Sequence, residues 1–285
     1  MLCKDSWSQG TLLSLLQGSE VDLTASYKLS ADLDLSGLEE TWEPIGQRGT
    51  DGFSGTFDGG GHAITGLTLT NSDIGQGDYT ALFGVINEGA VVSNVSVDVV
   101  FNDPQPSRSN KGAIAGESFG TIDGVFATGF IRGEDAIGGL VAHNYGVIVR
   151  SYARVDIEAG GRFGGLAGVN RNGGTIAESY AAGTLAYKTG GDLPNTAGGL
   201  IGVAYSGSAA ERSFLDSDLA GTDKAVGDDG SGGGVGETDV IGLATDDAQS
   251  EEVIAGAPLN FDLDDVRAID PEVNDGYPYL QANPP

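Results

Sequence analysis

The chain contains one cysteine, two histidines and few basic residues, and each shortage excludes a class of protein. Cys3 cannot form a disulfide within the chain; we expect an untethered terminal thiol, with a link to another chain as the alternative. The 14 lysine and arginine residues face 41 aspartate and glutamate residues, which gives a formal net charge of −27. Nucleic acids and anionic membrane surfaces attract basic patches, so neither is an expected partner.

Long apolar runs are also missing. No stretch of the sequence is apolar enough to cross a membrane, and no signal peptide is recognisable. We therefore expect no membrane insertion, and we interpret the chain as a mature or excised module whose export signal is absent.

Residue patterns that would support catalysis are scarce. His62 and His143 are far apart in sequence, and no nucleophile–histidine arrangement, metal-binding histidine pair or phosphate-binding loop is present. Acidic and arginine side chains could meet on one flank, as they do in polysaccharide-active β-helix enzymes, but such pairs are more often surface ion pairs. These residues are Asp123, Asp135 and Asp156 with Arg132, Arg150, Arg154 and Arg162. We predict that the protein is not an enzyme and needs no cofactor.

Glycine is abundant and is arranged in a repeat. The Gly-Gly-Leu sequence that ends at Leu140 returns at Leu166, 26 residues later (166 − 140 = 26), and both copies close with Ser-Tyr-Ala. Inserts at 102–110 and 186–196 widen the spacing of the outer copies. A repeat of this length indicates one supersecondary unit that is stacked many times. The equivalent positions are Leu82, Ile114, Leu140, Leu166 and Leu200, which we expect to form one buried column.

Each repeat favours strands over helices. Its apolar runs are short, Val95, Val97 and Val99 alternate with polar residues, and glycine or asparagine ends each run. A single coil of short strands cannot bury its own apolar face, so stability must come from neighbouring coils. We predict an all-β protein, a right-handed parallel β-helix (β-solenoid).

Two segments follow the pattern Gly-Leu-x-Gly, namely 165–168 and 199–202, whereas 139–142 lacks the last glycine. In this motif the chain resembles the GLUG-motif family of secreted and surface-exposed β-solenoids, and the resemblance covers roughly residues 25–280. Members of that family are mostly parts of adhesins, other large surface proteins and some secreted peptidases, whose catalytic machinery lies in a different domain. The resemblance therefore implies a fold and an extracellular location, and no catalytic residue.

The ends of the chain differ from its middle. We expect a short N-terminal helical cap at 1–24, solenoid coils at 25–220, a Gly/Asp-rich loop at 221–236 and a C-terminal cap at 237–285. The repeats within the coils fall near 82–101, 112–131, 138–157, 164–185 and 198–216.

Candidate binding residues lie in the inserts and at one corner of the coil. The inserts contribute Asp103, Arg108, Tyr187 and Asp192, because solenoid inserts often form working loops. Phe119 and Tyr145, each followed by glycine, are candidates for exposed contacts at a corner, whereas the aromatic residues that follow serine (Tyr152, Tyr180 and Phe214) are expected to stack in the core. Stacked asparagines at that corner should bond to their own backbone and to one another.

Asp228 and Asp229 are weak candidates for a metal site, with Ca²⁺ as the ion. The predicted function is an extracellular, cell-surface structural or adhesive module that is not catalytic, whose partners are other protein subunits or surface glycans. The alternatives are a homo-oligomeric subunit of an extracellular filament and a polysaccharide-active lyase or hydrolase.

Overall fold

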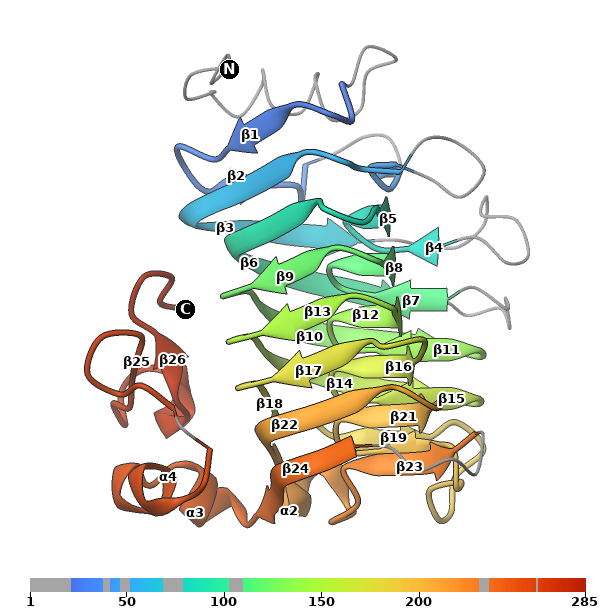
Figure 1. The fold of residues 1–285 in the computed structure, drawn as a ribbon, viewed down its shortest axis with the longest axis vertical. Coiled ribbons are helices and arrows are strands. Elements are labelled where there is room, and N and C mark those ends of the chain that lie inside the picture. The colour runs from blue at the N-terminus through green and yellow to red at the C-terminus, as the bar shows by residue number, and fades with distance from the viewer. Residues whose placement is uncertain are drawn as a thin grey trace.

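The computed structural model describes residues 22–37, 42–46, 52–68, 79–102, 110–230, 236–259 and 261–285. The predicted N-terminal cap and Cys3 lie outside these residues, except for the last positions of the cap at 22–24. Strands make up 53% of the structure and wind into a parallel β-solenoid of about 7 turns, which confirms the predicted fold class (Figure 1).

Three sheets run along the stack of coils, and all strand pairs within them are parallel. The largest sheet contains β1 (Ser26–Lys28), β2 (Leu33–Asp34), β3 (Thr56–Thr68), β6 (Val91–Asn102), β9 (Thr121–Asp123), β10 (Phe126–Gly133), β13 (Val147–Val149), β14 (Tyr152–Ala159), β17 (Thr175–Ala177), β18 (Tyr180–Ala181), β19 (Leu185–Tyr187), β22 (Ala209–Asp216) and β24 (Gly236–Leu243). The second contains β4 (Tyr79–Thr80), β7 (Asn110–Gly112), β11 (Ala136–Gly138), β15 (Arg162–Gly164) and β20 (Ala197–Gly198). The third contains β5 (Phe83–Ile86), β8 (Ala115–Ser118), β12 (Val141–Asn144), β16 (Ala167–Asn170), β21 (Ile201–Ala204) and β23 (Val226–Asp229).

The predicted leucine column runs through the interior. Its five residues (Leu82, Ile114, Leu140, Leu166 and Leu200) are fully buried and belong to one hydrophobic cluster. Backbone hydrogen bonds link successive members, with the N–H of Leu140 donating to the carbonyl of Leu166 at 3.0 Å and that of Leu166 donating to Leu200 at 2.9 Å. The 26-residue repeat therefore places equivalent side chains directly on one another.

A second corner of each coil turns through a residue with positive φ. These residues occupy equivalent positions: Asn94, Gly124, Arg150, Glu178, Arg212 and Asp239. In three successive coils the next residue is serine, and the N–H of Ser151 donates to the hydroxyl of Ser179 at 3.1 Å, as Ser179 does to Ser213 at 3.2 Å. Each of these hydroxyls also donates to the carbonyl two residues earlier. The serine of the repeat thus satisfies backbone groups that the turn would leave without partners.

The aromatic residues after these serines stack, but outside the coil. The rings of Phe126, Tyr152, Tyr180 and Phe214 are parallel and 4.7–4.8 Å apart. Successive side chains of a strand point to opposite faces, so Ala127 fills the interior while Phe126 lies on the outer face of the sheet. The predicted core stack of Tyr152, Tyr180 and Phe214 is therefore confirmed, and it belongs to a second hydrophobic cluster on the outer face of the sheet.

The C-terminal segment covers this outer column. It contains α3 (Thr245–Ala248), α4 (Glu251–Gly256), β25 (Arg267–Ala268), the 3₁₀ turn η1 (Asn274–Gly276) and β26 (Tyr279–Leu280), and it lies along the left flank of the stack in Figure 1. The coils continue through β23 and β24, past the expected boundary at 220; a short helix, α2 (Ser217–Ala220), lies between β22 and β23.

Replacing Leu166 by alanine should lower the free energy of unfolding by about 2–5 kcal/mol, because the cavity is surrounded by coils that cannot collapse into it. Denaturant titration measures the loss. Val100, which is 43% exposed on β6, provides the matched control, since Val100→Ala should change stability by less than about 0.5 kcal/mol. Equal losses in the two variants would contradict the assigned column.

Candidate binding surfaces

One corner of the solenoid carries a row of exposed and half-buried ring and guanidinium groups. The row consists of Phe119, Tyr145, Arg171 and Tyr205, which we call the corner ladder; each follows the last residue of β8, β12, β16 or β21. Those last residues are in register from coil to coil, so the ladder residues also lie one above another.

The members of the corner ladder contact one another. The rings of Phe119 and Tyr145 stack with centroids 4.5 Å apart and planes inclined by 15°. The guanidinium carbon of Arg171 lies 5.7 Å from the ring centroid of Tyr145 and 4.8 Å from that of Tyr205. Arg171 is therefore held between two tyrosine rings by cation–π contacts. Phe119 is 40% exposed, and the other three members are half-buried.

Buried asparagines fix the backbone beneath the ladder. The side-chain amide of Asn144 donates to Asn170 Oδ1 at 2.9 Å, and the amide of Asn170 donates to the carbonyl of Gly174 at 3.0 Å. Asn144 Oδ1 also accepts from the N–H of Gly146 at 3.3 Å. Asn87 bonds elsewhere, to the carbonyl of Gly52 and the hydroxyl of Ser54. The asparagine network expected from the sequence is thus present at Asn144 and Asn170.

Arg171 differs from the other arginines that the structure describes. Five of them form ion pairs: Arg132 with Glu158, Arg150 with Asp123, Arg154 with Asp275, Arg162 with Asp135, and Arg212 with Glu178 and Glu211. Arg267 donates to the carbonyl of Glu178 at 2.6 Å. Arg171 forms no ion pair with a carboxylate of the described residues, whereas its buried Nε without a hydrogen-bond partner is a feature shared with Arg132, Arg154 and Arg212.

Of the four predicted insert residues, the structure describes Tyr187 and Asp192. Asp103 and Arg108 lie outside the described residues. Tyr187 belongs to β19 and packs against the interior core, whereas Asp192 is exposed in the loop that follows. The sequence analysis identified Phe119 and Tyr145 but missed Arg171, which stands at the same repeat position with arginine in place of an aromatic ring.

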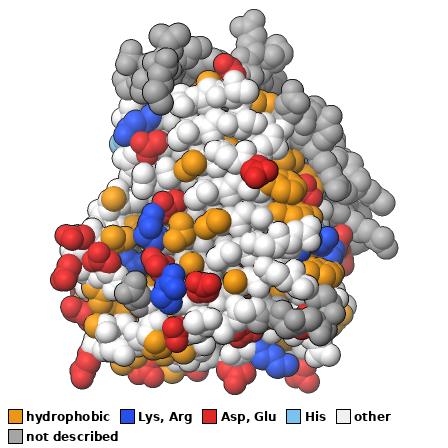
Figure 2. All heavy atoms as spheres, viewed as in Figure 1, with side chains coloured by type: hydrophobic (Ala, Val, Ile, Leu, Met, Phe, Trp, Pro, Cys, Tyr) orange, Lys and Arg blue, Asp and Glu red, His pale blue; other side chains and the backbone are white. Residues whose placement is uncertain are grey.

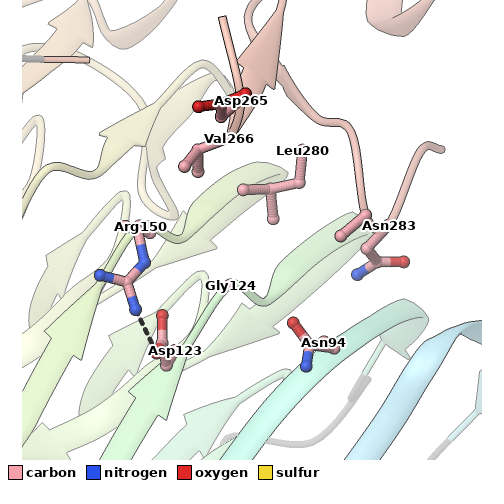
Figure 3. A pocket seen from close by; sticks show the side chains of 9 residues that line it. Asn94, Asp123, Gly124, Arg150, Asp265, Val266, Leu280 and Asn283 are labelled. Atoms are coloured by element: carbon pink, nitrogen blue, oxygen red, sulfur yellow. Dashed lines mark hydrogen bonds and ion pairs between the residues drawn. The ribbon is translucent and has the colours of Figure 1, made fainter. Parts of the chain in front are cut away.

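A pocket of about 170 Å³ separates the solenoid from the C-terminal segment (Figure 3). Asn94, Asp123 and Arg150 line its solenoid side, and Val266 and Leu280 line the other. Asp123 and Arg150 are paired with each other, and Asp265 is the third charged residue of the lining.

The candidate metal residues lie in a strand. Asp228 and Asp229 belong to β23 and pair with Val203 and Ala204 of β21. Within the described ranges, no three histidine, cysteine or acidic side chains gather closely enough to hold a metal ion. Ca²⁺ binding remains a prediction.

The C-terminal segment is anchored by polar groups buried beneath it. Arg267 is 1% exposed, lies 4.2 Å from the ring centroid of Phe261, and has its pKa lowered to about 10 by burial. The hydroxyl of Tyr180 donates to the carbonyl of Pro278 and accepts from Asn274 Nδ2 at 2.8 Å. Burial raises the pKa of Tyr152, Tyr180 and Tyr277 above the usual value, and for Tyr277 the hydrogen bond to Asp216 adds to the rise.

Negative charge is concentrated in the C-terminal segment. From Ala244 onward, Arg267 is the one basic residue among many acids, and Figure 2 shows acidic side chains along the lower and left margins, where α3 and α4 lie in Figure 1. None of the helices in the described ranges is both long and apolar enough to span a membrane.

No family model matches the chain. The resemblance to GLUG-motif proteins therefore rests on the motif alone. Halomucin of Haloquadratum walsbyi is 33% identical over 138 residues, which are 45% of this chain and 1% of that protein. A protein of Evansella cellulosilytica named "Putative Gly-rich membrane protein" is 35% identical over 109 residues, which are 38% of this chain and 12% of that protein. The chain thus spans a small part of the length of these relatives.

Two solved structures share the fold. A "putative immunoglobulin A1 protease" of Bacteroides ovatus has a TM-score of 0.60 and 21% identity over 90% of this chain and 86% of its own. A structure named "IgA1 Protease" has a TM-score of 0.51 and 21% identity over 77% of this chain and 16% of its own. Both are named as proteases, which contradicts the prediction that the protein is not an enzyme, and that prediction is withdrawn. At this identity the likeness shows the shared fold.

Alkaline pH should unfold the protein from above about pH 10. The three buried tyrosines lose their protons more readily in the unfolded chain. Each therefore lowers the free energy of unfolding by about 1.4 kcal/mol for every pH unit above pH 10. Arg267, whose pKa is lowered on folding, has the opposite sign and offsets about one tyrosine. Denaturant titrations from pH 8 to 11, with tyrosinate absorbance, measure the loss. Tyr180→Phe should reduce the slope, and titration of every tyrosine near pH 10 without unfolding would contradict the burial.

Salt should raise the thermal midpoint. The acidic residues that give a net charge of −27 repel one another, and the screening length falls from about 10 Å at 0.1 M to about 3 Å at 1 M ionic strength.

If Asp228 and Asp229 contribute to a Ca²⁺ site, millimolar CaCl₂ should raise the thermal midpoint more than NaCl of equal ionic strength, and Asp228→Asn should remove the additional rise. Identical thermal melts in CaCl₂ and NaCl of equal ionic strength would contradict Ca²⁺ binding. A thermal midpoint that falls as NaCl is added would show that attractive ion pairs outweigh the repulsion.

Proposed function

We propose that this chain is an extracellular β-solenoid module of a larger surface or secreted protein, and that it has a structural and adhesive role. The observation that carries the proposal is the corner ladder: four contacting side chains, one exposed and three half-buried, along one corner of the stack of coils. A surface of this kind requires little ordering when it meets a partner, because its side chains are already held by their neighbours.

The lengths of the relatives support the proposal that this chain is one module of a larger protein. Halomucin and the protein named as a Gly-rich membrane protein are far longer than this chain, which fits a module within a long polypeptide. The solved structures named as IgA1 proteases support the same view, since one of them is much larger than the region that this chain matches. The proposed role concerns this chain and is compatible with a protease elsewhere in the same protein.

A filament subunit is the second candidate. The last coil, which contains β23 and β24, favours it because its outer strand edges could pair with a second copy of the chain. In the part of the chain that the structure describes, no strand pairs with the outer edge of β23 or β24. Two exposed acids on β24, Glu237 and Asp239, oppose such pairing, because charged edge residues discourage strand addition. Sedimentation that shows concentration-dependent growth would favour this candidate, and Glu237→Lys should then change the assembly.

The proposal predicts that the module is accessible on intact cells of the source organism or is released by them. Limited proteolysis of intact cells, with mass spectrometry of the released peptides and of the medium, should recover peptides from 110–230. A cytoplasmic enzyme serves as the lysis control. Recovery only after lysis would overturn the extracellular role.

A further inference from the structure

We propose that the corner ladder binds the carboxylate groups of acidic glycans, with Arg171 as the anion-binding residue. The inference deepens the adhesive role proposed above and rests on it. Uronic acids and sialic acids share the chemistry required, which is a carboxylate attached to a sugar ring.

The guanidinium of Arg171 is held in place before any ligand binds, and no carboxylate of the described residues forms an ion pair with it. Its guanidinium lies between the rings of Tyr145 and Tyr205, so its position is set before any ligand arrives. A guanidinium offers a planar fork of donors that fits a carboxylate through two parallel hydrogen bonds. The acidic surface makes this arginine unusual, because five other described arginines are paired with carboxylates.

Acidic residues near the ladder limit the range of the attraction. Glu117, which is half-buried, and Asp228, which is exposed, occupy equivalent positions on β8 and β23, in register with His143 and Val203, two residues before the corner. Together with the net charge of −27, they repel an approaching polyanion at low salt. Binding must therefore come from short-range contacts with Arg171 and the rings, and moderate salt screens the repulsion.

The shape of the ladder favours a glycan over an acidic peptide. One face of the Phe119 ring packs on Tyr145, and the preceding coil has Asn87, without a ring, at the equivalent position. Phe119, which is 40% exposed, thus ends the stack and offers a flat apolar surface two coil steps from Arg171. A sugar ring has an apolar face that can lie on an aromatic ring, and a chain of sugars can extend along the ladder to place a carboxylate at the guanidinium.

The test measures binding of three acidic oligosaccharides by calorimetry in 0.5 M NaCl: oligogalacturonate, oligoguluronate and oligosialate. The purified chain should bind at least one of them. Arg171→Gln should weaken that binding about tenfold or more, because it removes a charge-assisted pair. Phe119→Ala should weaken it as well. Arg162→Gln, which removes a half-buried arginine already paired with Asp135, should leave it unchanged.

Several outcomes would overturn the inference. These are no binding of any of the three oligosaccharides, equal binding by the wild-type chain and Arg171→Gln, equal binding of the carboxyl-reduced oligosaccharide, or equal binding of polyglutamate. Circular dichroism and thermal melts of each variant separate a lost site from a lost fold, and Arg171→Lys should restore part of the affinity if charge is the main contribution. Surface exposure without glycan binding would leave the extracellular role standing and remove only this inference.

Discussion

Parallel hydrogen bonds between successive coils hold each residue over its counterpart in the next coil, and the rest of the structure depends on this register. Because the register repeats every 26 residues in the central coils, any property of one repeat position becomes a column along the molecule. Leucine at one position makes a continuous core, serine at another satisfies the backbone of the turn, and asparagine at a third fixes a corner. No single coil could hold any of these arrangements alone.

The same register produces two columns of aromatic rings that differ in how much solvent reaches them. Phe126, Tyr152, Tyr180 and Phe214 stack at almost the same spacing as Phe119 and Tyr145, yet the first column is buried, whereas Phe119 is exposed and Tyr145 is half-buried. The difference comes from the C-terminal segment, which packs over the first column and anchors there through Arg267 and Tyr277. Stacking alone therefore does not decide whether a column is structural, because a covering segment must also be present.

Much of the fold could be predicted from the sequence, because a repeat converts local similarity into a spatial rule. The leucine column, the corner position of Phe119 and Tyr145, and the arginine–aspartate ion pairs of Arg150 and Arg162 followed from spacing alone. The orientation of the Tyr152 side chain, on the outer face of the sheet, could not be predicted. A tyrosine after a turn can point to either face, and the segment that covers it lies far away in sequence. Arg171 was missed because its chemistry differs from that of Phe119 and Tyr145, although its position does not.

Arg171 is also where the stack of rings along the corner ladder is interrupted. An aromatic residue there would continue the ring stack from Phe119 to Tyr205, as the covered column does without interruption. The chain instead places a cation between two rings, on a surface where most other described arginines are neutralised by carboxylates. The rings of Tyr145 and Tyr205 stabilise this half-buried cation, and no carboxylate of the described residues forms an ion pair with it. The ring that ends the stack and the arginine without a described carboxylate partner are the two features on which the proposed glycan binding depends.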